Sequence, residues 1–398
     1  MPSHPFVHCH WHSTRSTLDG YGLETAMADR TQELGHFAAA VTDHGNVCAH
    51  VRFDQAMRKK GLRPIFGVEA YITDDLTLKT AINDTLGVNA FPHVTILAAT
   101  QQGYTNLLHL NQIAYQEGFH KYPRIDWPTL ARFQEGLVVM SGCPLGYPTR
   151  LIEGKGPEAC WEWMKKWSSR IERFYVELTP SPGYDVSERT LLPLLRIAHD
   201  LGLPPVLTAD VHFPRPEDHR AQDVMLAIGT GRQVNDPTRI LADYKLYYAC
   251  DVKELYQRAG HWIGPLTGEL PGHDLLKEAI RNTGRIAEQC EVELPRANQV
   301  FFPGTPKHWT AADYLWLKVG GGLLNRVEQG LIREDQLDEY RERCNQEFQV
   351  LREKGFTDYI LIVADVISAM REQGALILTR GSAGGCCFSR YWRTVRLA

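Results

Sequence analysis

The stretch Phe6-Val7-His8-Cys9-His10-Trp11-His12, near the start of this 398-residue chain, is the most informative part of the sequence. Side chains alternate between the two faces of a β-strand, so His10 and His12 would point the same way if the stretch is extended. Asp210 and His212 repeat this spacing much later in the chain. Two such strands would direct imidazole and carboxylate groups into one pocket, as in a metal site. A single His-x-His pair is also common on polar surfaces, so the rest of the sequence must decide.

Short apolar runs of strand length recur in the first 212 residues, and each has a metal-capable residue at one edge. A buried strand has no packing reason to end repeatedly on His, Glu, Asp or Cys. The pattern is typical of a barrel mouth, where strand ends and the loops after them carry the chemistry. The residues are His44 after Ala38 to Val41, Glu69 after Pro64 to Val68, His93 before Val94 to Ala99, Cys143 after Gly136 to Gly142, and Asp210 after Pro205 to Ala209.

Together these motifs resemble those of a polymerase and histidinol phosphatase (PHP) domain, in the form found at the N-terminus of bacterial DNA polymerase III alpha subunits. The motifs are His10-x-His12, Leu18-Asp19-Gly20, Thr42-Asp43-His44-Gly45-Asn46, Gly67-Val68-Glu69, His93, Ser141-Gly142-Cys143 and Asp210-Val211-His212. The resemblance implies a distorted (β/α)7 barrel in the α/β class, and catalytic roles for Asp210 and His212. It also implies nine metal ligands, which are His10, His12, Asp19, His44, Glu69, His93, Cys143, Asp210 and His212.

A later part of the chain is similar to the start of the polymerase palm of the same family. The similarity lies in residues 355–365 and in the segment Arg380-Gly381-Ser382-Ala383-Gly384-Gly385. In the family this second segment is implicated in holding the phosphates of the incoming nucleotide, which implies a nucleotide site at Arg380, Gly381 and Ser382. Glycines let backbone N–H groups approach an anion, and arginine supplies a bidentate donor. A glycine-rich run with one arginine is otherwise most often a turn.

We expect three regions: a phosphoesterase domain at 1–275, a mostly helical start of the palm at 276–385, and a divergent tail at 386–398. Repeated strand and helix patterns in the first region favour a parallel barrel or a doubly wound sheet. The tail contains three arginines and no acid, and it stops resembling the family, whose palm aspartates lie further downstream. Nucleotidyl transfer needs metal-binding carboxylates of that kind. We therefore expect a C-terminally truncated fragment with no polymerase activity of its own.

Composition indicates a cytoplasmic protein. The formal net charge is −4, so the chain lacks the strongly basic surface of an independent DNA-binding domain. Nine cysteines form an odd, scattered set, which favours a reducing compartment over a disulfide framework. Neither a signal peptide nor an apolar run long enough to span a membrane is visible.

The expected ligand set would hold two or three divalent ions, with zinc favoured by imidazole and thiolate ligands and manganese or iron as alternatives. Such ions activate water and neutralise phosphate oxygens. The resemblance implies 3′→5′ exonuclease hydrolysis at a DNA primer 3′ end, and contacts with the sliding clamp and other replisome subunits if a C-terminal part completes the chain. Asp43, beside His44, would either orient a ligand imidazole or cap a turn. Two alternatives stay open: a free-standing phosphatase for a small phosphate ester, and a non-catalytic scaffold stabilised by metal.

Overall fold

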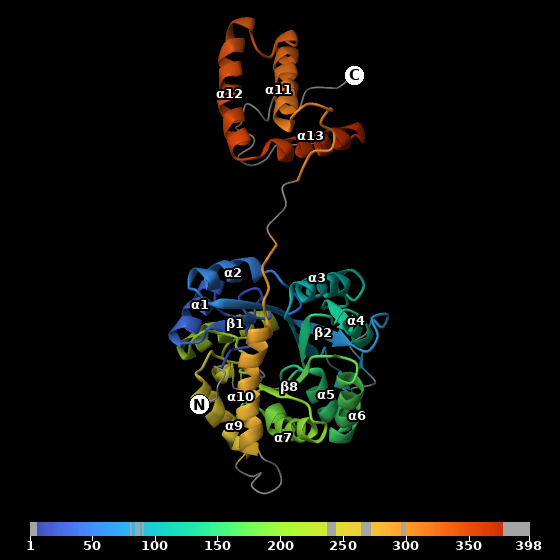
Figure 1. Ribbon diagram of the computed structural model, residues 1–398, viewed down its shortest axis with the longest axis vertical. Coiled ribbons are helices and arrows are strands. Elements are labelled where there is room, and N and C mark those ends of the chain that lie inside the picture. Colours follow the sequence, from blue (N-terminus) through green and yellow to red (C-terminus); the bar gives the residue numbers. More distant parts are fainter. Residues whose placement is uncertain are drawn as a thin grey trace. The chain divides into compact units, whose positions relative to one another are not determined.

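The computed structural model describes residues 6–79, 82–83, 88–89, 91–236, 244–263, 272–295 and 300–376. The chain divides into two compact units, Met1–Leu294 and Pro295–Ala398, which are described separately here as unit 1 and unit 2. In unit 1, helices surround a sheet (Figure 1). The expected boundary at residue 275 lies inside helix α10 (Gly272–Gln289), so unit 1 extends further along the chain than the predicted domain. The assignment of activities to the predicted ranges stays a prediction.

Unit 1 is built on a seven-stranded mixed sheet with the order β1-β2-β5-β7-β8-β9, in which β6 also pairs with β2. The expected α/β class is confirmed, but uniformly parallel pairing is wrong, because β5 runs antiparallel to both β2 and β7. A parallel pair needs a long crossover, whereas only the small β3-β4 sheet lies between β2 and β5 among the described residues. The strands are β1 Ala38–Val41, β2 Arg63–Thr73, β3 Ile82–Asn83, β4 Val88–Asn89, β5 His93–Ala98, β6 Arg124–Asp126, β7 Leu137–Met140, β8 Phe174–Leu178 and β9 Pro205–Leu207.

The N-terminal segment joins the two edges of this sheet. His8 forms a parallel bridge with Ala39 of β1, and Trp11 forms one with Val211, which follows β9. The His10 carbonyl oxygen also accepts a hydrogen bond of 3.1 Å from the Val211 N–H group. The segment therefore closes the sheet into a distorted barrel and places the histidine motif between the first and last strands.

Alternate residues of the strands line the barrel interior in layers. An apolar layer, which includes Ile65 of β2 and Leu97 of β5, packs against Ile286 of α10. Helix α10 is tied to this end of the barrel, because the Asn282 side-chain amide donates a 2.7 Å hydrogen bond to the Pro205 carbonyl. Since inward positions recur every two residues, polar side chains can follow this apolar layer along the same strands.

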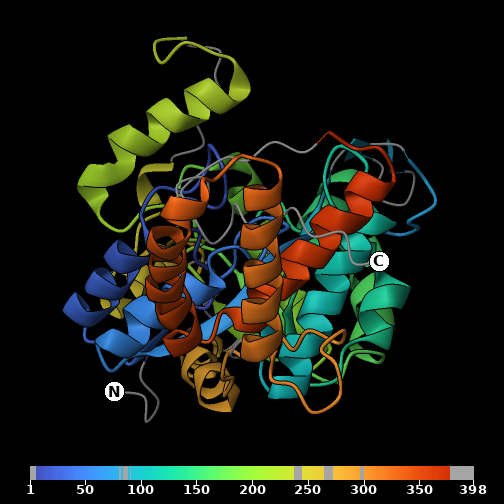
Figure 2. The same ribbon diagram turned by 90° about the horizontal axis from the view of Figure 1, so that it is seen from above.

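The helices of unit 1 cover the outside of the sheet, and the yellow-green helix α8 lies at the edge of the unit in Figure 2. Polar caps fix where two of them begin. The Thr100 hydroxyl accepts from the Gly103 N–H at the start of α3, and the Asp126 carboxylate accepts from the Thr129 N–H at the start of α4. The helices are α1 Glu24–Glu33, α2 His50–Lys59, α3 Gln101–Gln116, α4 Trp127–Arg132, α5 Tyr147–Lys155, α6 Pro157–Ser168, α7 Asp185–Asp200, η1 Pro216–Asp218, α8 His219–Thr230, η2 Tyr244–Leu246, α9 Val252–Ile263 and α10.

The described residues of unit 2 form helices and no strand, which confirms the expected helical character of this part of the chain. The helices are α11 Ala311–Glu328, η4 Glu334–Gln336, α12 Leu337–Glu353 and α13 Thr357–Glu372. Leu315 and Leu323 of α11 pack with Phe348 of α12 and Leu361 of α13 in a small apolar core. The predicted nucleotide site at Arg380, Gly381 and Ser382 lies outside the described residues. Within the described parts of both units, no helix is long and apolar enough to cross a membrane.

Candidate metal centre

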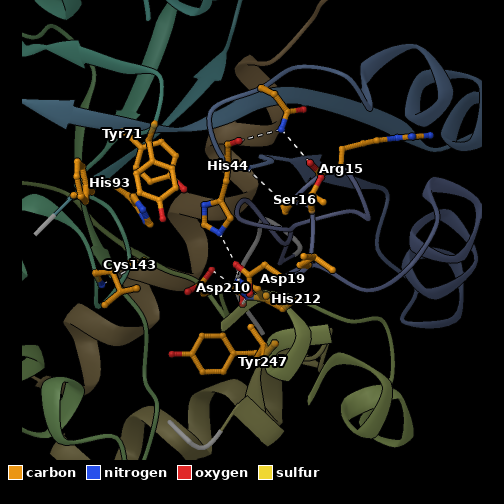
Figure 3. A pocket seen from close by; sticks show the side chains of 18 of the residues that line it. Arg15, Ser16, Asp19, His44, Tyr71, His93, Cys143, Asp210, His212 and Tyr247 are labelled. Atoms are coloured by element: carbon orange, nitrogen blue, oxygen red, sulfur yellow. Dashed lines mark hydrogen bonds and ion pairs between the residues drawn. The ribbon is translucent and has the colours of Figure 1, made fainter. Parts of the chain in front are cut away.

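The nine predicted ligands gather at one pocket, and six of them are labelled in Figure 3. The pocket is a cavity of about 700 Å³. Three predicted ligands, His10, His12 and Glu69, are fully buried beside the pocket. The other six line its wall, and these are Asp19, His44, His93, Cys143, Asp210 and His212.

Strand periodicity explains how residues far apart in the sequence reach this pocket. Glu69 lies two and four residues after the inward positions Gly67 and Ile65 of β2, so its side chain also points inward. The register between β2 and β5 pairs Glu69 with Thr95. It also pairs Tyr71 with His93. Because His93 lies two residues before Thr95 in β5, its side chain points to the same face as that of Thr95. The adjacent strands therefore present a carboxylate and an imidazole to the same space.

Glu69 occupies the centre of the cluster. Its Oε1 atom lies 3.1 Å from His93 Nδ1 and accepts from the Cys143 thiol at 3.2 Å. Its Oε2 atom lies 2.7 Å from His44 Nδ1 and 3.4 Å from His12 Nε2. The two carboxylate oxygens thus face different imidazoles, so Glu69 could offer both oxygens to divalent ions.

Asp210, three residues after the end of β9, is a second carboxylate that contacts several imidazoles. Its backbone has a left-handed conformation, with φ at 48°, which is uncommon for a residue other than glycine. Its Oδ1 atom lies 3.3 Å from His10 Nε2 and 3.4 Å from His12 Nε2. At the mouth, Asp19 Oδ2 lies 2.7 Å from His44 Nε2 and 3.4 Å from the Nε2 atom of His212. The three carboxylates are therefore interleaved with the imidazoles.

Hydrogen bonds hold the imidazoles in one orientation. His10 Nδ1 donates to the Glu177 carboxylate at 2.7 Å. The Ser16 hydroxyl donates a 2.7 Å hydrogen bond to the Asp43 carboxylate, so it accepts one of 3.0 Å from His12 Nδ1. Both rings consequently point an Nε2 lone pair into the pocket. The expectation that Asp43 orients a ligand imidazole agrees with this geometry, although Asp43 acts through Ser16 and on His12.

The two Nε2 atoms of His10 and His12 face each other at 3.0 Å. Two lone pairs in this position repel, so either one Nε2 carries a proton that it donates to the other, or a cation lies beside them. His212 follows the same pattern, because its Nδ1 donates to the Asp210 carbonyl at 2.8 Å and leaves Nε2 for the pocket. The donor set therefore calls for positive charge in the pocket.

Burial and neighbouring charges set the protonation of the cluster. Burial, with His44 and His212 nearby, lowers the pKa of His12 to about 3, so this imidazole is neutral. Burial by itself would raise the pKa of the Asp210 carboxyl, but His10 and His212 outweigh it and lower that pKa to about 2. His212 behaves differently, because Asp19 and Asp210 outweigh burial and raise its pKa to about 9. Divalent cations bind neutral imidazoles and ionised carboxylates, so they would take the place of protons in this cluster.

Unpaired buried atoms give an independent test of whether metal ions fit here. Glu69 Oε2, Asp210 Oδ1 and His44 Nδ1 are buried and lack a well-formed hydrogen bond, although Glu69 Oε2 and His44 Nδ1 face each other at 2.7 Å. Such atoms are costly to bury unless something satisfies them. The structure also brings together three overlapping groups of donor atoms that would each hold an ion, namely His12 with His44 and His212, His10 with His12 and Glu69, and His44 with Glu69 and His93. The residues fit divalent metal ions, and their roles as ligands remain our proposal.

Sequence reasoning missed the polar layer beneath the metal ligands. Glu177 of β8 is 1% exposed, and it accepts hydrogen bonds from the Thr95 and Thr208 hydroxyls at 2.9 and 2.7 Å as well as from His10. A detectable signal was present, because Glu177 is the single acid in the apolar run Phe174 to Leu178. A carboxylate in a buried strand needs partners inside the protein.

Comparison with known families agrees with this geometry. Residues 8–181 match the family model of the PHP domain, and residues 314–394 match that of the bacterial DNA polymerase III alpha NTPase domain. The alpha subunit from Mycobacterium tuberculosis (strain ATCC 25618 / H37Rv) is 33% identical over 395 residues, which cover 96% of this chain and 32% of that protein. Over almost its whole length, the chain is similar to bacterial DNA polymerase III alpha subunits. The residues that match the PHP model contain seven of the nine predicted ligands, and the other two, Asp210 and His212, follow β9.

Other alpha subunits match to a similar extent. The alpha subunit from Aquifex aeolicus (strain VF5) is 29% identical over 396 residues, covering 96% of this chain and 33% of that protein. The chain thus spans about a third of the length of the curated relatives it matches. Among solved structures, a Bifidobacterium adolescentis protein named a metal-dependent phosphoesterase matches with a TM-score of 0.34 and 12% identity over 53% of this chain and 89% of its own. An amidohydrolase from Chromobacterium violaceum, with bound sulfate and no metal, matches with a TM-score of 0.36 and 12% identity. That match covers 55% of this chain and 96% of the amidohydrolase.

Proposed function

We propose that the metal centre hydrolyses phosphodiester bonds at the 3′ end of DNA, as a 3′→5′ exonuclease within a replicative polymerase alpha subunit. The observation that carries the proposal is that Asp210 lines an open cavity of about 700 Å³, with Glu69 buried beside it, and that the oxygens of both face several imidazoles. Catalytic metal sites keep an accessible position, whereas structural sites are closed by protein ligands. This feature favours an enzyme over a metal-stabilised scaffold.

The ligand chemistry supports two or three divalent ions held by all nine predicted ligands, with zinc first and manganese or iron as alternatives. Divalent ions in such a site lower the pKa of water and neutralise charge on a phosphate group. Asp210 and His212, which line the cavity, are the residues to which we assign catalytic as well as metal-holding roles.

Two arginines supply positive charge to the cavity wall. Arg15 pairs with Glu24 at 3.2 Å, and Arg150 pairs with Glu153 at 2.7 Å. Each pairing limits the positions that the guanidinium group can take. Arginine donates in parallel to phosphate oxygens. These side chains would hold the phosphates of a substrate while the metal ligands stay fixed beneath.

The homology supports further proposals about the protein in the cell. We assign it to the cytoplasm and to DNA replication, with primer DNA, the sliding clamp and other replisome subunits as partners. We also assign the phosphates of a nucleotide to Arg380, Gly381 and Ser382, because arginine and exposed backbone N–H groups bind anions.

The decisive experiment compares two substrates under the same conditions. Purified chain is assayed with manganese or zinc on a single-stranded oligonucleotide labelled at its 5′ end, and on p-nitrophenyl phosphate. The proposal expects stepwise shortening from the 3′ end, with little release of p-nitrophenol. Faster hydrolysis of p-nitrophenyl phosphate would establish the alternative of a small-ester phosphatase, and no hydrolysis of either by metal-loaded protein would favour the scaffold.

Two variants separate the centre from a contaminating nuclease. Asp210→Asn should abolish shortening, because it removes the charge that His10 and His12 face. Asp200→Asn is the matched control, since Asp200 is exposed at the end of α7 and lies outside the metal centre. Shortening that survives Asp210→Asn would show that another protein causes it.

A further inference from the structure

An aromatic surface leads from the metal ligands to the outside of the pocket. We name it the aromatic wall and define it as Tyr71, Phe91, Tyr115 and Tyr122, all of which line the cavity. Tyr71 lies beside His93, on the side of the pocket away from Tyr247 (Figure 3). The two rings are 4.7 Å apart and nearly perpendicular, so the wall begins in contact with a predicted ligand.

The wall continues outward by ring-on-ring contacts. Tyr122 stacks on Tyr71 with ring centres 4.4 Å apart and planes within 17°. Phe91 meets Tyr122 edge-to-face at 5.0 Å. Tyr115 comes from α3 and is 48% exposed, so it is not part of an apolar core. Rings that serve only packing are normally buried, whereas these rings keep surface open to the cavity.

A lysine is held over the wall by a turn. Lys121 has a left-handed backbone conformation, with φ at 60°, between the bridged residues His120 and Tyr122. Its ammonium nitrogen lies 5.5 Å from the Phe91 ring centre and 5.4 Å from the Tyr122 ring centre. An uncommon backbone conformation is thus used to place a cation beside two exposed rings.

The close approach of the wall to the ligands depends on a glycine. Gly45 follows His44 and has φ at 59°. A Cβ atom at this position would lie 2.8 Å from the Pro123 ring and 3.3 Å from the Tyr71 ring. A larger residue would clash with Pro123 and press on the Tyr71 ring, so the wall packs closely against the backbone beside His44.

We propose that the aromatic wall stacks the bases of the last nucleotides of a single DNA strand, and that Lys121 contacts their backbone. Aromatic rings beside a cation are the general means of binding single-stranded nucleic acid without sequence preference. A small phosphate ester has no base to place on these rings. The inference builds on the proposed function, because it identifies the strand end as the group that the metal centre receives.

The test uses Tyr122→Ala, with Tyr122→Phe to retain the ring and Tyr359→Ala as the matched control. Tyr359 is 58% exposed in α13 of unit 2. The substrates are a ten-residue oligothymidylate, the same oligomer with three abasic sites at its 3′ end, and bis(p-nitrophenyl) phosphate. Tyr122→Ala should raise KM for the oligothymidylate about tenfold or more with a small change in kcat. Tyr122→Phe and Tyr359→Ala should stay close to the unmutated chain.

Rates on the abasic oligomer and on bis(p-nitrophenyl) phosphate should be the same for Tyr122→Ala and the unmutated chain, since neither substrate offers terminal bases. An equal loss on all three substrates would give Tyr122 a structural role and overturn the inference. If the unmutated chain hydrolyses no substrate, the proposed exonuclease fails, and fluorescence anisotropy then tests the wall alone. Tighter binding of oligothymidylate than of the abasic oligomer, lost in Tyr122→Ala, would support the wall, and equal binding would refute it.

Discussion

The two units of this chain differ in what they bury. Unit 1 encloses acids such as Glu69, Glu177 and Asp210, each no more than 4% exposed, together with the imidazoles that face them. In unit 2, Asp358 is the one buried acid among the described residues, and it accepts a single 2.8 Å hydrogen bond from the Phe302 N–H. Unit 2 also leaves large apolar side chains exposed on its helices, including Leu317 at 56%.

The difference shows where each unit gains stability and where chemistry resides. Burying several charges is unfavourable unless each is paired or bound to a cation. In unit 1, the closed barrel and its apolar layer hold the buried carboxylates and imidazoles close together, where their opposite charges can pair. Unit 2 has a small helical core and no comparable cluster among residues 300–376. Changes in the two units should therefore affect separate properties, and the predictions below test that separation.

Among the substitutions considered, Glu69→Gln is expected to lower metal affinity the most. The substitution keeps the shape of the side chain but replaces a charge that faces His44, His93 and His12. Metal affinity should fall by about 100-fold or more, because Glu69 contributes both oxygens to the cluster. Elemental analysis and calorimetric titration would measure this. Asp358→Asn in unit 2 should leave metal content unchanged, and metal loss in that variant, or normal affinity in Glu69→Gln, would contradict the separation.

Leu361→Ala tests the opposite case in unit 2. Leu361 is 1% exposed in the small core, so its truncation should lower the free energy of unfolding of unit 2 by about 2–5 kcal/mol. Hydrogen exchange should become faster in α11 and α13, while the strands of unit 1 and the metal content stay unchanged. Leu317→Ala, at an exposed position of α11, is the control and should change stability by less than about 0.5 kcal/mol. Faster exchange throughout unit 1 would show that the units are coupled.

Acid should destabilise unit 1 through His50. Burial lowers the pKa of this histidine from 6.5 to about 4 in the folded protein, where Nε2 donates to the Gly67 carbonyl at 2.9 Å. Below pH 6.5 the unfolded chain binds the proton more strongly, so stability present above that pH is lost as the pH falls toward 4. The loss is about 2–3 kcal/mol. In His50→Gln, chemical denaturation should show a shallower decline between pH 7 and pH 4.5, and an unchanged decline would exclude His50 as its source.

Glu177→Gln is expected to lower metal affinity by less than Glu69→Gln does. Glu177 touches His10 but faces the interior of the barrel, so it orients a ligand without binding metal in our proposal. Metal affinity should fall by about 10-fold to 100-fold while unfolding remains cooperative. Calorimetric titration checks the affinity, with exposed Glu172→Gln as the control. An affinity equal to that of the unmutated chain would mean that the Thr95 and Thr208 layer orients His10 without this charge.

The sequence pattern predicted buried strands with metal-capable residues at their ends, because the two-residue period of a strand carries from apolar interior positions to residues such as Glu69. The distorted barrel and the full set of nine residues came from the resemblance to the PHP family. The pattern did not predict the direction of β5, since an apolar run such as His93 to Ala98 reads the same in both directions. Glu177 was missed because its importance depends on hydrogen bonds across the barrel. Only the structure shows that the N-terminal segment closes the barrel, through the bridges of His8 to Ala39 and of Trp11 to Val211.

The aromatic wall could not be predicted from the sequence either, because it depends on contacts between distant segments. Tyr71, Phe91, Tyr115 and Tyr122 come from four different segments, and no spacing links them in the sequence. Only the folded chain shows that these rings meet beside His93.

The most direct test of the account is the metal content of the unmutated chain. Elemental analysis of protein purified without added chelator should find two or three divalent ions per chain, and their removal by EDTA should lower the melting temperature of unit 1. Both results follow from buried carboxylate oxygens and imidazole lone pairs that face one another without other partners. A chain with no stoichiometric metal, and with the same melting temperature before and after EDTA, would contradict the metal centre and the function built on it.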